Sequence, residues 1–139
     1  MARFFLAALT ILSIVPAKAS NHITNFFPDK VITVTVDDKG YVFIGKDTLT
    51  SIELSDELQR RLWKTYMGTD KMYDAIHLDF KGEVSMNTKE SIKKAILEGQ
   101  KKALTDICLQ KHKKLFDDLN SHQQRKIRKQ FPVLFQREY

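Results

Sequence analysis

The chain has 139 residues, of which 42% are hydrophobic and 29% are charged, with only five glycines and three prolines. This length suits one ordinary domain, and the composition excludes a multidomain enzyme, a disordered chain and a fibrous protein. Its single cysteine, Cys108, excludes an intramolecular disulfide and any multi-cysteine zinc or iron–sulfur site. Lys and Arg outnumber Asp and Glu by 23 to 17, a formal charge of +6.

The first part of the chain has the layout of a secretory signal. Arg3 precedes a short apolar run over residues 4–15, and small residues stand at Ala17 and Ala19, where signal peptidase reads the chain. We therefore expect residues 1–19 to be a cleavable signal peptide. Cleavage leaves 21 basic and 17 acidic side chains, a charge of +4.

The alternative for the same segment is a short N-terminal anchor. A membrane-spanning helix needs about 20 predominantly apolar residues, and Pro16 and Lys18 interrupt this run. The expected location is the periplasm after cleavage, or the inner membrane facing the periplasm if the segment is retained. Residues 20–30 are expected to be an exposed N-terminal lead, and residues 31–139 a single domain.

The domain opens with the pattern of a β-hairpin. Residues 31–36 are a β-branched run typical of a strand, and residues 41–44 form a second short run. The turn formers at 37–40 end in Gly40, which supplies the positive φ that such turns require. Residues 45–47 are expected to close the hairpin.

The period then changes to that of a helix over residues 50–66. The predicted buried stripe is Leu54, Leu58 and Leu62. Ser51 or Ser55 is expected to cap its N-terminus, and Gly68 to end it.

Three further elements follow. Residues 75–80 alternate as a half-buried strand does, and residues 84–86 are a candidate for another short strand. A long helix is predicted over 88–114. A short helix is predicted over 121–130, ended by Pro132. Its expected capping box is Ser121 with Gln124.

The order hairpin, helix, strand, long helix, short helix predicts an α+β domain. We expect a small mixed sheet, opened by the hairpin, with helices packed on one face.

Catalytic and metal-binding patterns are missing from the sequence. The histidines do not form the pairs that a catalytic zinc requires, and neither a nucleophile elbow nor a phosphate loop is found. His77 is expected on the solvent face of a strand, and Cys108 in the core. The adjacent carboxylates at 37–38, 56–57 and 117–118 suit turns and helix starts. We therefore expect no enzyme, no cofactor and no metal.

The basic surplus is concentrated late in the chain, at Lys111, Lys113, Lys114, Arg125, Lys126, Arg128 and Lys129. One interpretation is a solvated helix face. The other is a surface for an acidic partner, which would be a membrane surface, a cell-wall polymer such as peptidoglycan, or a complementary protein. Nucleic acid is not expected, because the sequence has no aromatic-interleaved platform for single strands.

Three stretches carry a family resemblance. They are the hairpin at 31–45, the start of the first helix at 49–58, and the tail at 116–132, where an acidic Leu-containing turn leads into a short helix that ends in Phe131-Pro132. In this order they resemble the periplasmic domain of ExbD/TolR-type biopolymer transport proteins, particularly the Bacteroidetes-like branch. The resemblance covers roughly residues 31–132.

The resemblance implies a component of envelope energy transduction of the TonB or Tol type, which acts by protein–protein contact. The implied partners are ExbB/TolQ-like and TonB/TolA-like proteins, together with a second copy of the chain in a homodimer. Family members carry a membrane helix with a proton-coupling aspartate, whereas residues 4–17 contain no Asp or Glu. No functional residue of the family is therefore carried over. The alternative function is a stand-alone secreted module that binds peptidoglycan or another anionic envelope polymer.

Overall fold

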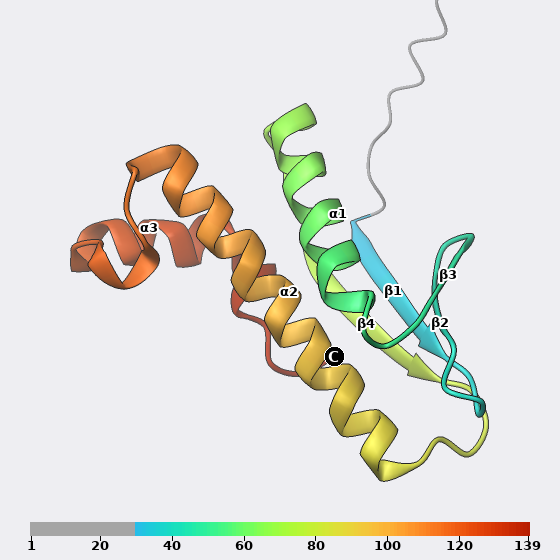
Figure 1. The fold of residues 1–139 in the computed structure, drawn as a ribbon. Coiled ribbons are helices and arrows are strands. Elements are labelled where there is room, and N and C mark those ends of the chain that lie inside the picture. The colour runs from blue at the N-terminus through green and yellow to red at the C-terminus, as the bar shows by residue number, and fades with distance from the viewer. Residues whose placement is uncertain (1–29) are drawn as a thin grey trace, which may run out of the picture.

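A computed structural model of the chain describes residues 30–139. The expected signal peptide and all but the last residue of the expected lead lie outside these residues. The strands are β1 (Val31–Val36), β2 (Val42–Ile44), β3 (Asp47–Leu49) and β4 (Ala75–Phe80). The helices are α1 (Leu54–Thr69), α2 (Met86–His112) and α3 (Ser121–Gln130), with 3-10 turns η1 (Phe116–Asp118) and η2 (Pro132–Phe135). The predicted α+β class is confirmed (Figure 1).

The sheet is small and mixed, as predicted. Its strand order is β3-β2-β1-β4, with β1 antiparallel to β2 and parallel to β4. The hairpin turn is confirmed, since Gly40 has a φ of +83° and the Asp37 carboxylate accepts hydrogen bonds from the amides of Lys39 and Tyr41. The connection from β1 to the parallel strand β4 contains α1. A crossover connection with a helix is the usual way to join parallel strands.

The second strand ends before Gly45, as expected, but Asp47 begins a third strand, β3, which the sequence did not predict. Gly45, at a φ of +62°, begins a second tight turn that folds β3 back onto β2, with Val42 opposite Leu49. The sequence of β3 shows no apolar alternation, because this three-residue edge strand buries none of its side chains fully. The turn at Gly45 and the backbone pairing with β2 hold this strand in place.

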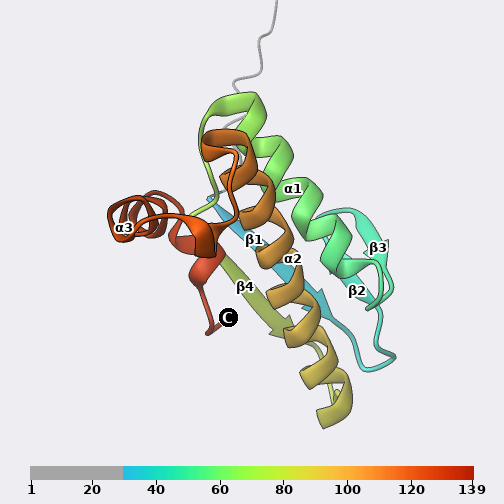
Figure 2. The same cartoon turned by 60° about the vertical axis from the view of Figure 1, so that its left-hand side comes forward.

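One face of the sheet is covered by helices. Ile32, Val34 and Val36 are buried, while the alternate residues of β1 face outward. Figure 2 shows α1 and α2 on the same side of the sheet. The core lies between this face and the two helices.

Helix α1 has the predicted stripe, because Leu54, Leu58 and Leu62 are all fully buried. Both predicted ends were wrong. The N-cap position is Glu53, whose carboxylate reaches back to the amide and hydroxyl of Thr50 at 2.8 Å, and these bonds lower the pKa of Glu53. The helix runs through Gly68 to Asp70, which takes the left-handed conformation at a φ of 57°.

Helix α2 begins earlier than predicted, and the expected strand at 84–86 was wrong. Ser85 is the N-cap, and its hydroxyl accepts a hydrogen bond from the Thr88 amide at 3.2 Å. Gly99 lies where α2 meets α1. A Cβ built at this glycine would stand 2.8 Å from both the Leu58 Cβ and the Ser55 carbonyl oxygen. The glycine therefore permits a backbone approach that any larger residue would prevent.

The chain after α2 folds back onto the body of the domain. Helix α3 has the predicted bounds, but its capping box is one residue earlier than expected and joins Asn120 to Gln123. Asn fills this position well because its side chain accepts the bond that a free helix amide needs. Phe131 and the apolar residues of η2 that follow it, Val133 and Leu134, are fully buried.

Two glutamines tie this tail to the sheet and to α2. The side-chain amide of Gln136 pairs with the backbone of Ile76 on the edge strand β4, donating to its carbonyl oxygen at 2.7 Å and accepting from its amide at 2.8 Å. The buried Gln100 donates to the carbonyl oxygens of Val133 and Gln136, and accepts from the Tyr139 hydroxyl at 2.8 Å. The side-chain amide nitrogen of Gln100 thus donates two hydrogen bonds, and its oxygen accepts one.

Candidate binding surface

The basic charge of the domain is segregated. Residues 30–100 contain eleven Lys and Arg against twelve Asp and Glu, whereas residues 101–139 contain ten against four. The second part holds the end of α2, η1, α3 and η2. Figure 1 shows α3 beside the end of α2 and on the opposite side of the molecule from the β2–β3 hairpin. The domain therefore has a nearly neutral body and a strongly basic end.

The seven basic residues singled out in the sequence are all exposed. They lie on the last turn of α2, in the segment that follows it, and on α3. In the described part of the chain none of the seven forms an ion pair, whereas Arg60, Arg61, Lys81 and Lys102 do. Their charge is therefore not neutralised by neighbouring carboxylates.

Two of the seven lie over aromatic rings. The Lys111 ammonium is 5.5 Å from the ring centres of both Tyr66 and Phe131, and it donates to the Tyr66 hydroxyl. The Arg128 guanidinium lies 5.1 Å from the ring of Phe116 and 4.6 Å from that of Phe135. Because these are separate aromatic pairs, the structure does not gather all seven cations into one site.

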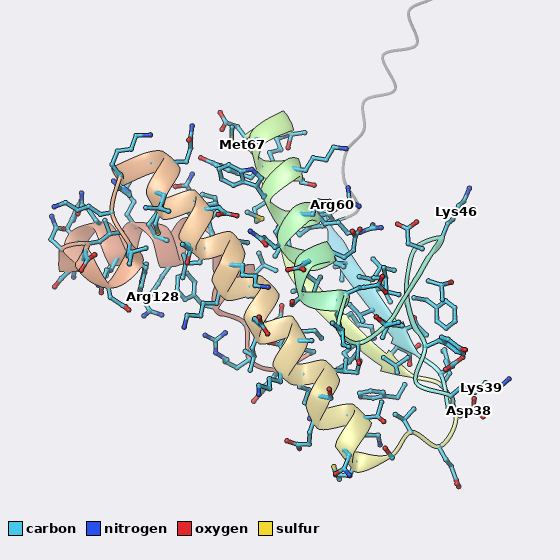
Figure 3. All side chains as sticks on the ribbon, in the orientation of Figure 1. Asp38, Lys39, Lys46, Arg60, Met67 and Arg128 are labelled. Carbon is cyan, nitrogen blue, oxygen red and sulfur yellow. The ribbon has the colours of Figure 1, made fainter. Side chains whose placement is uncertain are left out.

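Beside Arg128 is a groove of about 400 Å³ between α2 and the tail. Its apolar lining residues are Leu97, Leu104, Phe116, Leu134 and Phe135. Its charged lining residues are Lys101, Arg128, Arg137 and Asp117. Three cations thus surround an apolar floor that carries one carboxylate. Figure 3 labels Arg128 on the underside of α3, away from Lys39 in the β1–β2 turn and Lys46 in the β2–β3 turn.

Of the residues that line this groove, the sequence predicted only Arg128 as part of a candidate site. Leu97, Lys101 and Leu104 are spaced as neighbours on one side of a helix, so a second, weaker stripe on α2 was the available signal. No local pattern shows that Phe116 and Phe135 meet, with ring centres 5.3 Å apart, because the return of the tail brings them together.

A second hollow of similar volume lies between the start of α1 and α2. There the Lys102 ammonium is already paired with the carboxylates of Asp56 at 2.7 Å and Glu98 at 3.2 Å. This site therefore offers a ligand less unpaired charge than the groove beside Arg128.

The remaining candidate residues have structural positions. His77 is exposed on β4, and Cys108 is fully buried, both as predicted. Burial raises the pKa of the Cys108 thiol, which disfavours the nucleophilic thiolate. Within residues 30–139 there is no group of three His, Cys, Asp or Glu side chains that could hold a metal ion. No helix in this part of the chain is both long and apolar enough to cross a bilayer.

The three pairs of adjacent carboxylates lie on separate elements. Asp37 braces the hairpin turn, and Glu57 is bound by two arginines of α1. Asp117 and Asp118 form most of η1.

Comparisons of the chain with protein-family models, with curated proteins and with solved structures find no match.

Proposed function

We propose that this domain is an ExbD/TolR-like component of envelope energy transduction, exported to the periplasm, which works by protein–protein contact without catalysis of its own. The proposal rests on the ordered resemblance of the stretches 31–45, 49–58 and 116–132. Its partners would be ExbB/TolQ-like and TonB/TolA-like proteins, together with a second copy of the chain.

The observation that carries this proposal is the integration of the tail into the domain. Leu119, Ile127 and Phe131 are buried, and the Phe131 ring meets that of Tyr66 on α1 edge-on at 5.2 Å. The most characteristic of the three similar stretches is therefore part of the same core as the hairpin and the first helix. A tail built into the core presents its basic helix as a fixed surface.

The test is crosslinking in cells that produce the tagged full chain, followed by mass spectrometry of the recovered proteins. We expect ExbB/TolQ-like or TonB/TolA-like proteins and a crosslinked dimer. An exported protein of similar charge serves as the control. Recovery of neither partner class and no dimer would contradict the proposal.

The charge segregation favours a second candidate, a secreted module that binds peptidoglycan or another anionic envelope polymer through its basic end. Attraction between exposed charges weakens as ionic strength rises. Binding to purified peptidoglycan in a pelleting assay should therefore fall with added salt.

A matched pair of double variants tests where such binding occurs. Lys126→Gln with Lys129→Gln removes two charges from α3, and Lys39→Gln with Lys46→Gln removes two from the hairpin. All four side chains are exposed and form no ion pair within the described residues. We expect only the α3 variant to lose binding, and equal losses would contradict a specific basic surface.

A further inference from the structure

We propose that the groove between α2 and the tail binds an acidic peptide segment of a partner protein, with an apolar side chain against Phe116 and Phe135 and carboxylates on Arg128, Arg137 and Lys101. This inference gives the chemistry of the partner that protein–protein contact requires, and in that sense it rests on the proposed function.

The first support is the state of Arg128. Its guanidinium is held over two rings and has neither an ion pair nor a hydrogen bond from its side chain within residues 30–139. Contact with two rings restricts the side chain, and its N–H groups, which have no protein partner among the described residues, suit a carboxylate. Arg128 is therefore preorganised for an anionic group.

The second support is the set of cations around the same floor. Lys101 is exposed, and its ammonium has no partner in the described part of the chain. Arg137 donates to the carbonyl oxygen of Gln136 at 2.8 Å and also interacts with the Tyr139 hydroxyl, but it forms no ion pair within residues 30–139. Three cations against the single carboxylate of Asp117 make the groove complementary to a segment that carries several negative charges.

The third support is the apolar floor. Phe116 and Phe135 are half-buried and in contact, and Leu104 beside them is also half-buried. A floor of this kind gains from covering by one large apolar side chain. The ligand is thus acidic and also contains an apolar anchor, which describes an amphipathic peptide.

Two other anionic partners fit less well. A sugar polymer has no large apolar side chain to cover Leu97 and Leu104, which line the floor beside the two rings. A bilayer would take up protruding apolar side chains, yet the most exposed of these within residues 30–139 lie outside the groove: Ile52 at 87%, just before α1, and Met86 at 69%, the first residue of α2.

The test measures fluorescence anisotropy of a labelled peptide, Glu-Glu-Leu-Phe-Glu-Glu, against the full chain. Arg128→Gln is compared with Arg125→Gln, which removes the same charge from the same helix at an exposed residue that makes no ring contact. Loss of a charge-assisted contact should weaken binding about tenfold in Arg128→Gln. Arg125→Gln should stay within about twofold of the wild type, as expected for a rim charge.

Because Arg128 packs on Phe116 and Phe135, its replacement could weaken binding by disturbing the fold. A second variant separates this effect from the loss of charge. Lys101→Glu alters an exposed side chain on the other side of the groove, and it should weaken the peptide while leaving the thermal melt unchanged. If Arg125→Gln and Arg128→Gln weaken peptide binding equally, the peptide is attracted by the overall positive charge and the groove is not its binding site. If the chain binds phosphatidylglycerol vesicles through Arg128 but does not bind the peptide, the ligand of the groove is a membrane surface and the proposal of a peptide ligand is wrong.

The two proposals fail separately. Peptide binding does not depend on which protein supplies the acidic segment, so it would survive a failure to recover ExbB/TolQ-like or TonB/TolA-like proteins. Conversely, recovery of those partners in a strain that produces Arg128→Gln, at wild-type levels, would overturn the groove alone.

Discussion

Gln100 shows how a single buried polar residue sets the position of the tail. It is 1% exposed, and its amide group joins α2 to the backbone at Val133 and Gln136 and to the Tyr139 hydroxyl. Such a network stabilises one arrangement only while all its members are paired. The tail is therefore held in register by hydrogen bonds as well as by burial of its apolar side chains.

Replacement of this residue should be costly. Gln100→Leu keeps a similar volume but removes the side-chain donor of the Val133 carbonyl oxygen and the acceptor of the Tyr139 hydroxyl, so we expect the free energy of unfolding to fall by about 1–3 kcal/mol. Chemical denaturation measures the difference. The control is Gln110→Leu, an exposed glutamine of the same helix, which should change stability by less than about 0.5 kcal/mol. Equal effects of the two substitutions would contradict a specific role of the network.

At the scale of elements, the two helical glycines, Gly68 and Gly99, have opposite surroundings. Gly99 lies in the contact, and Gly68 lies in the last turns of α1 with nothing within 4 Å of an added Cβ. Alanine is favoured over glycine in a helix by about 1 kcal/mol. At Gly99, however, the added carbon meets the backbone of Ser55, which has no rotamer through which to yield.

We therefore expect opposite signs for the same substitution. Gly99→Ala should destabilise the domain by about 1–3 kcal/mol, because overpacking pushes the helices apart. Gly68→Ala should stabilise it by up to about 1 kcal/mol. Thermal denaturation of both variants measures the signs. A stabilising Gly99→Ala would show that α1 and α2 are less closely packed than described.

At the scale of the whole molecule, one ion pair joins α1 to β3. Arg61 donates to the carboxylates of both Glu57 on its own helix and Asp47 at the start of β3. The hydrogen bond from Arg60 is the main reason why the pKa of Glu57 is lowered, burial acts in the opposite direction, and Arg61 adds to the lowering. Glu57 is therefore a stabilising group only while it is ionised.

This pKa predicts an acid-sensitive contribution to stability. Because the folded state lowers the pKa of Glu57 below its usual value of about 4.3, its contribution is complete above that pH and is lost as the pH falls through the folded value. Glu57→Gln should therefore be less stable at neutral pH and should have a flatter stability profile below about pH 5. Urea denaturation across this range measures both, with Glu90→Gln, an exposed glutamate without an ion pair, as the control. Identical slopes in all three proteins would contradict it.

The sequence was sufficient where local pattern decides the structure. The β-branched run of β1, the leucine stripe of α1 and the bounds of α3 follow from periodicity and turn residues. It was insufficient where distant contacts decide. β3 is held by a turn and a partner strand, and the closeness of α1 to α2 at Gly99 depends on both helices at once.

The candidate site divides in the same way. The basic end could be predicted from the sequence, because the positions of charged residues along the chain are known without the fold. The groove could not be predicted, because it forms only when the tail folds back and places Phe116 and Phe135 beside α2. Arg128 belonged to the predicted set only as a charge, and its place over two rings depends on residues on either side of it in the chain.

The pairing of Gln136 with β4 has a consequence for synthesis of the protein. The side chain that occupies the edge of β4 comes 60 positions after Ile76, the residue it protects. At about 5–20 residues per second, translation leaves this edge without Gln136 for roughly 3–12 s. An unprotected edge strand readily pairs with another chain. Copies of the chain that lie side by side before Gln136 is in place can therefore pair through their β4 edges.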